Sequence, residues 1–166
     1  MSLRTFIQDH PALLVWGWKL TERIVKGMAP LFRRVGIERA SAVLLPLETL
    51  FKKTVFDCRE CGQCVLHYTG MTCPMTCPKQ LRNGPCGGVR PDGKCEVYPK
   101  KDCIWVKALE RIERTSYAAE KLRLNPPVDR QLEGLSSYVT FAVGRDQVCT
   151  GNETPNVYAD VKQEPQ

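Results

Sequence analysis

A dense group of cysteines constrains the fold of this chain more than any other feature. Eight of the nine cysteines in the 166 residues lie between residues 58 and 103, in a segment that is rich in Gly, Pro and Lys. A segment so poor in large apolar residues cannot fold on hydrophobic burial alone, so we expect bound metal to supply much of its stability. The eight residues are Cys58, Cys61, Cys64, Cys73, Cys77, Cys86, Cys95 and Cys103.

The N-terminal sequence favours metal binding over disulfide formation. The apolar run from Pro11 to Trp18 is too short to span a membrane, and no small-residue cleavage site follows it. We therefore expect a cytoplasmic protein whose thiols stay reduced. Cys149 stands apart from the others and is expected to be a free thiol.

The spacing of the first cysteines is typical of an iron–sulfur cluster. Cys58, Cys61 and Cys64 form a C-x2-C-x2-C run, whereas structural zinc sites usually show two separate C-x2-C pairs. With two residues between ligands, a tightly looping backbone brings three thiolates to three corners of one small cube. The fourth ligand is Cys73 or Cys77, each of which precedes a proline, and the spacing does not decide between them.

Eight thiolates make two sites of four ligands each. The simplest interpretation is two [4Fe–4S] clusters, with the four cysteines left over from the first site forming the second. The alternative is one [4Fe–4S] cluster and one zinc ion, and a purely structural metal module would use the same thiols. His67 could complete a site of three thiolates, but eight cysteines already suffice.

The charge of the chain agrees with an anionic cofactor. The formal net charge is +6, and two oxidised four-thiolate clusters of about −2 each would lower it to about +2. No basic reading helix or base-stacking aromatic motif is evident, so we expect no nucleic-acid partner. The basic residues of the cysteine segment either offset the cluster charge or form a solvated surface; they are Lys79, Arg82, Arg90, Lys94, Lys100 and Lys101.

Residues 1–56 are predicted to form an amphipathic helical arm. Asp9 is placed to cap a first helix with Pro11 in its first turn, and a second helix is expected over residues 38–51, broken or kinked near Pro46. Helical spacing groups Leu13, Trp16, Leu20, Ile24 and Met28, while Leu14, Trp18 and Val25 widen this stripe.

The arm either packs on its own domain or docks elsewhere. It carries more apolar surface than so short a segment can hide, so we expect another subunit or lipid headgroups to cover it, and peripheral membrane contact through 1–56 remains an alternative. The residues concerned are Trp16, Trp18, Phe32, Leu44, Leu45, Leu47 and Phe51.

The predicted fold class is a small metal-stabilised, loop-rich cysteine domain with a short β-hairpin, flanked by the N-terminal helical arm and by a C-terminal helix and extended tail. The hairpin is expected over 89–97 around the turn Pro91-Asp92-Gly93, and the helix over 104–123. The predicted divisions are 1–56, 57–124 and 125–166. The last division carries a short strand at "SSYVTFAV" and a disordered end.

Several motifs together resemble a known family. The stretches "CRECGQC", "TGMTCPMTCPKQLRNGPCGG" and "DGKCEV" followed by "CIW" are similar to the cysteine-rich domain associated with methylenetetrahydrofolate reductase, and "NPPVDRQLEGLSSYVTF" resembles its tail. The resemblance spans residues 57–141. In that family the domain is a separate small subunit in acetogen-type reductases and is fused to the catalytic barrel elsewhere.

The resemblance implies a partner for the chain. The family's reaction reduces methylenetetrahydrofolate on a flavin, FMN, held in a TIM barrel, and this chain is too short for a barrel and lacks alternating strand–helix units. The implied role is an accessory subunit without catalytic residues. It would pass single electrons between a donor, such as ferredoxin or a larger electron-transfer module, and the flavin subunit. The alternative is an adaptor that assembles the reductase complex without a redox role.

Overall fold

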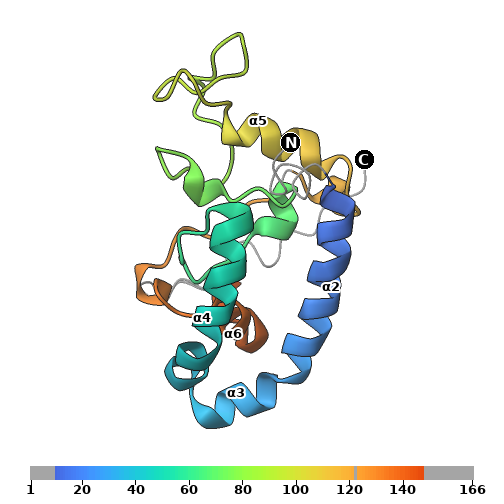
Figure 1. Ribbon diagram of the computed structural model, residues 1–166, viewed down its shortest axis with the longest axis vertical. Helices are drawn as coiled ribbons and strands as arrows, with labels where there is room; N and C mark the ends of the chain where they lie inside the picture. The colour runs from blue at the N-terminus through green and yellow to red at the C-terminus, as the bar shows by residue number, and fades with distance from the viewer. Residues whose placement is uncertain (1–9, 122, 148–166) are drawn as a thin grey trace.

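The computed structural model describes residues 10–121 and 123–147, which form a helical fold (Figure 1). The predictions for Asp9, for Cys149 and for the disordered end lie outside these residues. The described helices are α2 (Pro11–Gly27), α3 (Ala29–Val35), α4 (Ile37–Phe56), α5 (Ile104–Ile112) and α6 (Ser137–Val143), and the short 3-10 helices are η1 (Leu66–Thr69), η2 (Pro74–Thr76), η3 (Ala118–Glu120), η4 (Arg130–Leu132) and η5 (Arg145–Gln147).

Local sequence signals explain where the first three helices begin and end. Pro11 occupies the first turn of α2, where its missing N–H costs nothing. Gly36, with φ of 93°, separates α3 from α4. Pro46 lies inside α4 without breaking the helix. The helix also continues beyond the predicted segment 38–51, to Phe56.

Helix α6 lies between α2 and α4 and completes the core of the helical half (Figure 1). Val139 on α6 is fully buried and joins a cluster with Val25, Phe32 and Ala40. The predicted strand at 136–143 is therefore wrong. A short apolar run fits a buried helix as well as a strand, and the contacts with three helices decide for the helix.

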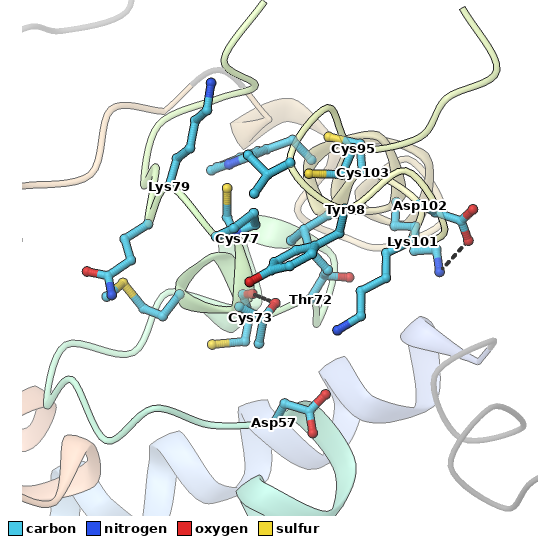
Figure 2. A pocket seen from close by; sticks show the side chains of 18 of the residues that line it. Asp57, Thr72, Cys73, Cys77, Lys79, Cys95, Tyr98, Lys101, Asp102 and Cys103 are labelled. Carbon is cyan, nitrogen blue, oxygen red and sulfur yellow. Dashed lines mark hydrogen bonds and ion pairs between the residues drawn. The ribbon is translucent and has the colours of Figure 1, made fainter. Parts of the chain in front are cut away.

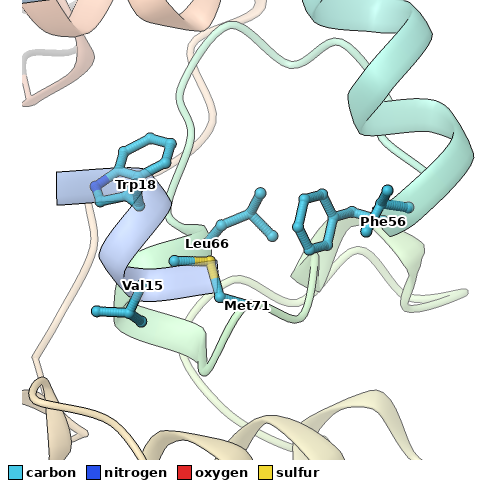
Figure 3. Packing of buried hydrophobic residues seen from close by; sticks show 6 residues of the cluster. Val15, Trp18, Phe56, Leu66 and Met71 are labelled. Carbon is cyan, nitrogen blue, oxygen red and sulfur yellow. The ribbon is translucent and has the colours of Figure 1, made fainter. Parts of the chain in front are cut away.

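A second core joins the helices to the cysteine segment. Val15 and Trp18 of α2 pack with Phe56 at the end of α4 and with Leu66 and Met71 around η1, as Figure 3 shows. The partly buried cysteines 64 and 73 pack against this cluster. The first cysteines are thus attached to an apolar core built largely by the N-terminal helices.

A buried ion pair ties α4 to the start of α6. Lys52 and Glu48 are only 2% and 6% exposed, and the Lys52 Nζ lies 2.8 Å from the Glu48 Oε1. The same ammonium donates to the Ser137 hydroxyl at 2.7 Å, and the Ser136 hydroxyl donates to the other Glu48 oxygen. Charges so deeply buried are tolerated because each has several partners.

The predicted β-hairpin does not form. The turn itself is present, because the Gly93 N–H donates to the Arg90 carbonyl at 2.8 Å. The following residues turn away, however: the Cys95 N–H donates to the Lys101 carbonyl, and the described residues contain one isolated antiparallel bridge, between Lys94 and Asp102, in place of strands. Two tight turns in succession leave no length for a second strand.

The expectation of a metal-stabilised, loop-rich domain is also wrong as a description of the fold. The described residues are largely helical and have apolar cores of their own. Within this part of the chain, no group of three or more His, Cys, Asp or Glu side chains could hold a single metal ion. The reason is that the helices assigned to a separate arm supply apolar surface to the cysteine segment.

Helix α5 is shorter than the predicted helix over 104–123. It ends at Ile112, where the Thr115 hydroxyl donates to the Ile112 carbonyl and accepts the N–H of Tyr117. Such local side-chain bonds compete with the helical pattern. The buried face of α5, with Trp105 and Ala108, packs with Cys103, so the helix closes the cysteine segment from one side.

The outward faces of α2 and α4 are strongly apolar. The predicted apolar stripe of α2 divides: Trp18 and Val25 face the core together with Val15, whereas Leu13, Trp16, Leu20 and Ile24 are exposed. No helix among residues 10–121 and 123–147 is long and apolar enough to cross a membrane. We name the exposed residues the α2 stripe (Leu13, Trp16, Leu20, Ile24) and the α4 stripe (Val43, Leu47, Leu50, Phe51).

Candidate functional site

The first three cysteines and Cys73 line one narrow cavity between the end of α4 and η2. Burial, followed by the influence of the neighbouring thiols of Cys64, Cys58 and Cys61, raises the pKa of Cys73 to about 12. The pKa of Cys58 is likewise raised to about 11, first by burial. The structure thus groups Cys73, rather than Cys77, with the C-x2-C-x2-C run.

The loop that carries these thiols is shaped by left-handed backbone. Asp57 ends α4 with φ of 53°, and Glu60 and Gly62 also have positive φ. The Glu60 N–H donates to the Cys58 Sγ at 3.4 Å, an example of a backbone donor turned toward sulfur. A Cβ at Gly62 would lie 2.1 Å from the Leu132 carbonyl oxygen, so only glycine allows this loop to approach η4 so closely.

Gln63, inside the "CGQC" motif, fastens the loop to the C-terminal segment. Its side chain is 1% exposed; the carbonyl Oε1 accepts the Asp129 N–H at 2.8 Å and the Nε2 donates to the Asp146 carbonyl at 3.2 Å. Because both ends of the amide are satisfied by backbone more than 60 residues away, the position of the thiol loop depends on the tertiary fold.

Two buried cations accompany this first set of thiols. Arg82 is 6% exposed and lines the same cavity, and its Nη2 donates to the Gln63 carbonyl at 2.8 Å. Lys52 lies near Cys64: burial opposes its charging, but the influence of Cys64 and Glu48 holds its pKa above the usual value. Sequence reasoning placed Arg82 among the basic residues of the segment but contained no signal for its burial or for Lys52.

The other four cysteines line a second, larger cavity of about 750 Å³ (Figure 2). Cys77 follows η2, Cys103 precedes α5, and Cys95 is held near Cys103 by hydrogen bonds between segments 93–95 and 101–103. Cys86 is exposed at the rim, where its thiol donates to a Glu96 carboxylate oxygen at 3.5 Å. All eight cysteines are free thiols.

The two cavities are neighbours. Cys73 lines both of them, and only the three residues of η2 separate it from Cys77. In Figure 2, Cys77, Cys95 and Cys103 surround one part of the larger cavity, and Cys73 lies on the side nearer Asp57. A group bound by the first set would therefore lie next to a group bound by the second.

Positive charge predominates around the larger cavity. Seven lysine or arginine side chains line it, against four carboxylates. Lys79 forms an ion pair with Glu96, and Lys107 forms one with Asp102 at 2.7 Å. The cationic excess is the electrostatic environment that an anionic cofactor requires.

The donor set and the charges fit iron–sulfur clusters. Each cavity is lined by at least four thiols, and the smaller one also holds a buried arginine with unpaired donors. The smaller cavity, about 30 Å³, has room for roughly two waters. The smaller cavity would therefore have to open and its thiols rearrange to take up a four-iron cube, whereas the larger cavity already has the volume.

His67 has a structural role rather than that of a ligand. It lines neither cavity, is 3% exposed, and stacks on Trp18 with ring centroids 4.9 Å apart. Burial, followed by the influence of nearby cations, lowers its pKa to about 3. The imidazole is therefore neutral at physiological pH and belongs to the apolar core.

Residues 37–131 match the model of the family described as "Methylene-tetrahydrofolate reductase C terminal". The match covers more than half of the chain. It includes all of α4 and all eight cysteines of the two cavities, and it ends before α6. Comparisons with curated proteins and with solved structures find no match.

Proposed function

The chain belongs to the family of methylene-tetrahydrofolate reductase C-terminal domains, and we propose that it is the iron–sulfur electron-transfer subunit of a flavin-dependent methylenetetrahydrofolate reductase. In this role it relays single electrons between a redox partner and the flavin subunit. Folate and FMN are held by the partner. The electron donor is a ferredoxin or a larger electron-transfer module.

The observation that carries the proposal is the grouping of eight free thiols around two adjoining cavities. Residues 58, 61, 64 and 73 would hold one [4Fe–4S] cluster, and residues 77, 86, 95 and 103 would hold the other. When bound, such clusters accept and release one electron at a time. Because Cys73 lines both cavities, the two clusters would be neighbours in the relay.

The residues of the chain prepare these sites in three ways. Phe56, Val65 and Met75 give the smaller cavity an apolar lining. The Gln63 bonds fix the loop, as described above. Thiolates are needed to bind metal, so the raised pKa values of Cys58 and Cys73 mean that binding must release protons.

The proposal is tested by anaerobic purification and metal analysis. We expect brown protein that dithionite bleaches, with about eight irons per chain. Cys61→Ser and Cys95→Ser, one in each set, should each lose about four irons, and Cys149→Ser should retain all of them. Protein without iron would refute the relay.

The same experiment separates the adaptor alternative. One [4Fe–4S] cluster with one zinc ion, or zinc alone, would use the same thiols but abolish a two-cluster relay. Colourless protein that contains zinc and still binds the flavin subunit would establish an adaptor. For the relay, we expect reduction of the flavin subunit by a reduced donor to depend on this chain and to fail with Cys61→Ser.

A further inference from the structure

We propose that Arg82 is a positioning residue for the group held by the first set of cysteines: its guanidinium donates N–H groups to the sulfur of a bound anionic cluster. The inference rests on the proposed function, because it requires a cluster at residues 58, 61, 64 and 73. It goes further by assigning a role to a residue that is not a ligand.

The first argument is the burial of unpaired donors. Arg82 is 6% exposed, and its Nη2 is satisfied by the Gln63 carbonyl. Its Nε and Nη1 have no hydrogen-bond partner among the described residues. Buried donors in folded proteins are nearly always paired, so two free donors on one buried cation indicate a partner that is not part of the protein.

The second argument is the location of these donors. Arg82 lines the cavity that the four thiols also line. The guanidinium is a planar fork, so fixing one nitrogen on the backbone of the "CGQC" turn limits where the other nitrogens can lie. The residue is thus held by the loop that carries Cys61 and Cys64.

The third argument is charge. A [4Fe–4S] unit with four thiolates carries about −2, and sulfur accepts N–H hydrogen bonds that raise the ease of reduction. Asp146 is a nearby carboxyl group: burial raises its pKa, and the Gln147 amide, its own backbone, Arg123 and, least of these, Arg82 act to lower it. Asp146 makes no ion pair with Arg82 in the described structure, so the buried guanidinium lacks a direct counter-charge.

Lys52 provides the contrast. It is the other deeply buried cation of the described residues, and it also lies near the first set of thiols. Its ammonium is fully engaged, with the Glu48 carboxylate at 2.8 Å and the Ser137 hydroxyl at 2.7 Å. Unpaired donors are therefore a property of Arg82 and not of every buried cation near this site.

The test is an anaerobic redox titration followed by electron paramagnetic resonance. Arg82→Gln removes the charge but keeps a shorter side chain with an amide donor, and Arg82→Lys keeps the charge. We expect Arg82→Gln to shift one of the two midpoint potentials to a more negative value and to leave the other unchanged. Arg82→Lys should give a smaller shift. Arg90→Gln, the matched control, removes an exposed arginine paired with Asp92 and should shift neither.

A purely structural role makes a different prediction. If Arg82 only anchors the Gln63 carbonyl, both potentials stay at their wild-type values in Arg82→Gln, which would overturn the proposal. Selective loss of about four irons in this variant would fit either role, so the potentials of Arg82→Lys would then decide. If Arg82→Gln loses all of its iron, Arg82→Lys becomes the deciding variant. Midpoint potentials equal to those of wild type for both clusters of Arg82→Lys would then overturn the proposal.

A second measurement separates the two roles without potentials. Chemical unfolding of Arg82→Met is compared with wild type in the iron-loaded protein and in the chelator-stripped protein. We expect a larger loss of stability in the loaded protein, because the free donors have a partner only there; equal losses would indicate a structural anchor. Wild-type protein that binds no iron would refute the proposed function itself, and the Arg82 role with it.

Discussion

At the scale of single residues, burial decides which ionisable groups of this chain are charged. His67 is buried and held neutral, whereas Lys52 and Glu48 are buried and held charged by each other and by the serines that begin α6. For Glu48, burial works against the carboxylate, and Lys52 with the two serine hydroxyls still holds the pKa below its usual value. Both situations lead to measurable effects on stability.

The first prediction concerns pH and His67. Its folded pKa of about 3 lies below the unfolded value of about 6.5, so the unfolded chain gains a proton first as the pH falls. The stabilising contribution is complete above pH 6.5 and is lost toward pH 3, by about 1.4 kcal/mol per pH unit inside that window. Between pH 7 and 5, wild type should lose about 2 kcal/mol more than His67→Phe.

Urea unfolding of both proteins at the two pH values measures this difference. Phenylalanine keeps the ring stack on Trp18 and removes the titration. The carboxylates contribute equally to both proteins and cancel in the comparison. Parallel losses of stability in wild type and variant would show that His67 can be protonated in the folded protein.

The second prediction concerns the buried ion pair. Lys52→Met should cost about 3–5 kcal/mol in the free energy of unfolding, because the Glu48 carboxylate remains buried without its cation. Adding Glu48→Gln should restore most of that loss. Lys26→Met is the matched control, since Glu22 and Lys26 have the same i,i+4 spacing but Lys26 is largely exposed, and it should cost at most about 0.5 kcal/mol.

A result in which Lys52→Met and Lys26→Met cost the same would mean that burial of the Glu48–Lys52 pair is unimportant. The double variant Lys52→Met with Glu48→Gln guards against a trivial packing effect. If it is as unstable as Lys52→Met alone, lost packing rather than an unpaired carboxylate is the cause.

At the scale of elements, the fold depends on how closely the thiol loop approaches η4. The Gly134 N–H donates to the Glu60 carbonyl at 2.9 Å, and the Thr140 hydroxyl of α6 donates to the Gly62 carbonyl at 2.5 Å. These bonds join the loop after α4 to segments some 70 residues later. The C-terminal segment is thus part of the structure that positions the first cysteines.

The third prediction tests this contact through Gly62. Gly62→Ala should place a methyl group against the Leu132 carbonyl, in addition to the strain of φ at +70°. Gly93→Ala is the matched control, because φ is +75° but nothing lies within 4 Å. The control should cost about 1–2 kcal/mol and Gly62→Ala about 1–3 kcal/mol more, measured by chemical unfolding. Equal costs would show that the loop can move away from η4.

At the scale of the whole molecule, the exposed α2 and α4 stripes require explanation. Trp16 and Leu47 are 66% and 71% exposed, which is unusual for a water-soluble surface of this size. The other faces of both helices carry core residues, among them Trp18 and Phe56. Removing the arm would therefore destroy the fold, so substitutions of exposed residues are needed to test docking.

The fourth prediction is that the stripes contact the reductase partner. Trp16→Ser combined with Leu47→Ser should change the free energy of unfolding by less than about 0.5 kcal/mol and weaken binding to the flavin subunit at least about tenfold. Arg39→Ser, an exposed change on α4, is the control and should leave binding unchanged. Co-sedimentation with anionic vesicles tests the lipid alternative. Vesicle binding that the double variant loses, with partner binding intact, would assign the stripes to membrane contact.

Local sequence patterns determined much of this protein. The x2 spacing of the first three cysteines, the helices after Pro11 and before Asp57, and the resemblance to the reductase-associated domain follow from residues close together in the chain. Periodicity identified the apolar residues of α2 but not which of them face the core. The helix carries apolar residues on two sides, so its sequence gives no local reason to bury one side rather than the other.

Only the tertiary structure decided the rest. Helix α6 replaces the predicted strand, Cys73 joins the first thiols, and Arg82 and Lys52 become buried because segments far apart in sequence pack together. Lys52 meets Ser137 across 85 residues, and no pattern of neighbouring residues records such a contact. Spacing specifies which atoms are able to bind a group, whereas long-range packing sets their burial, their charge and which of them lie together.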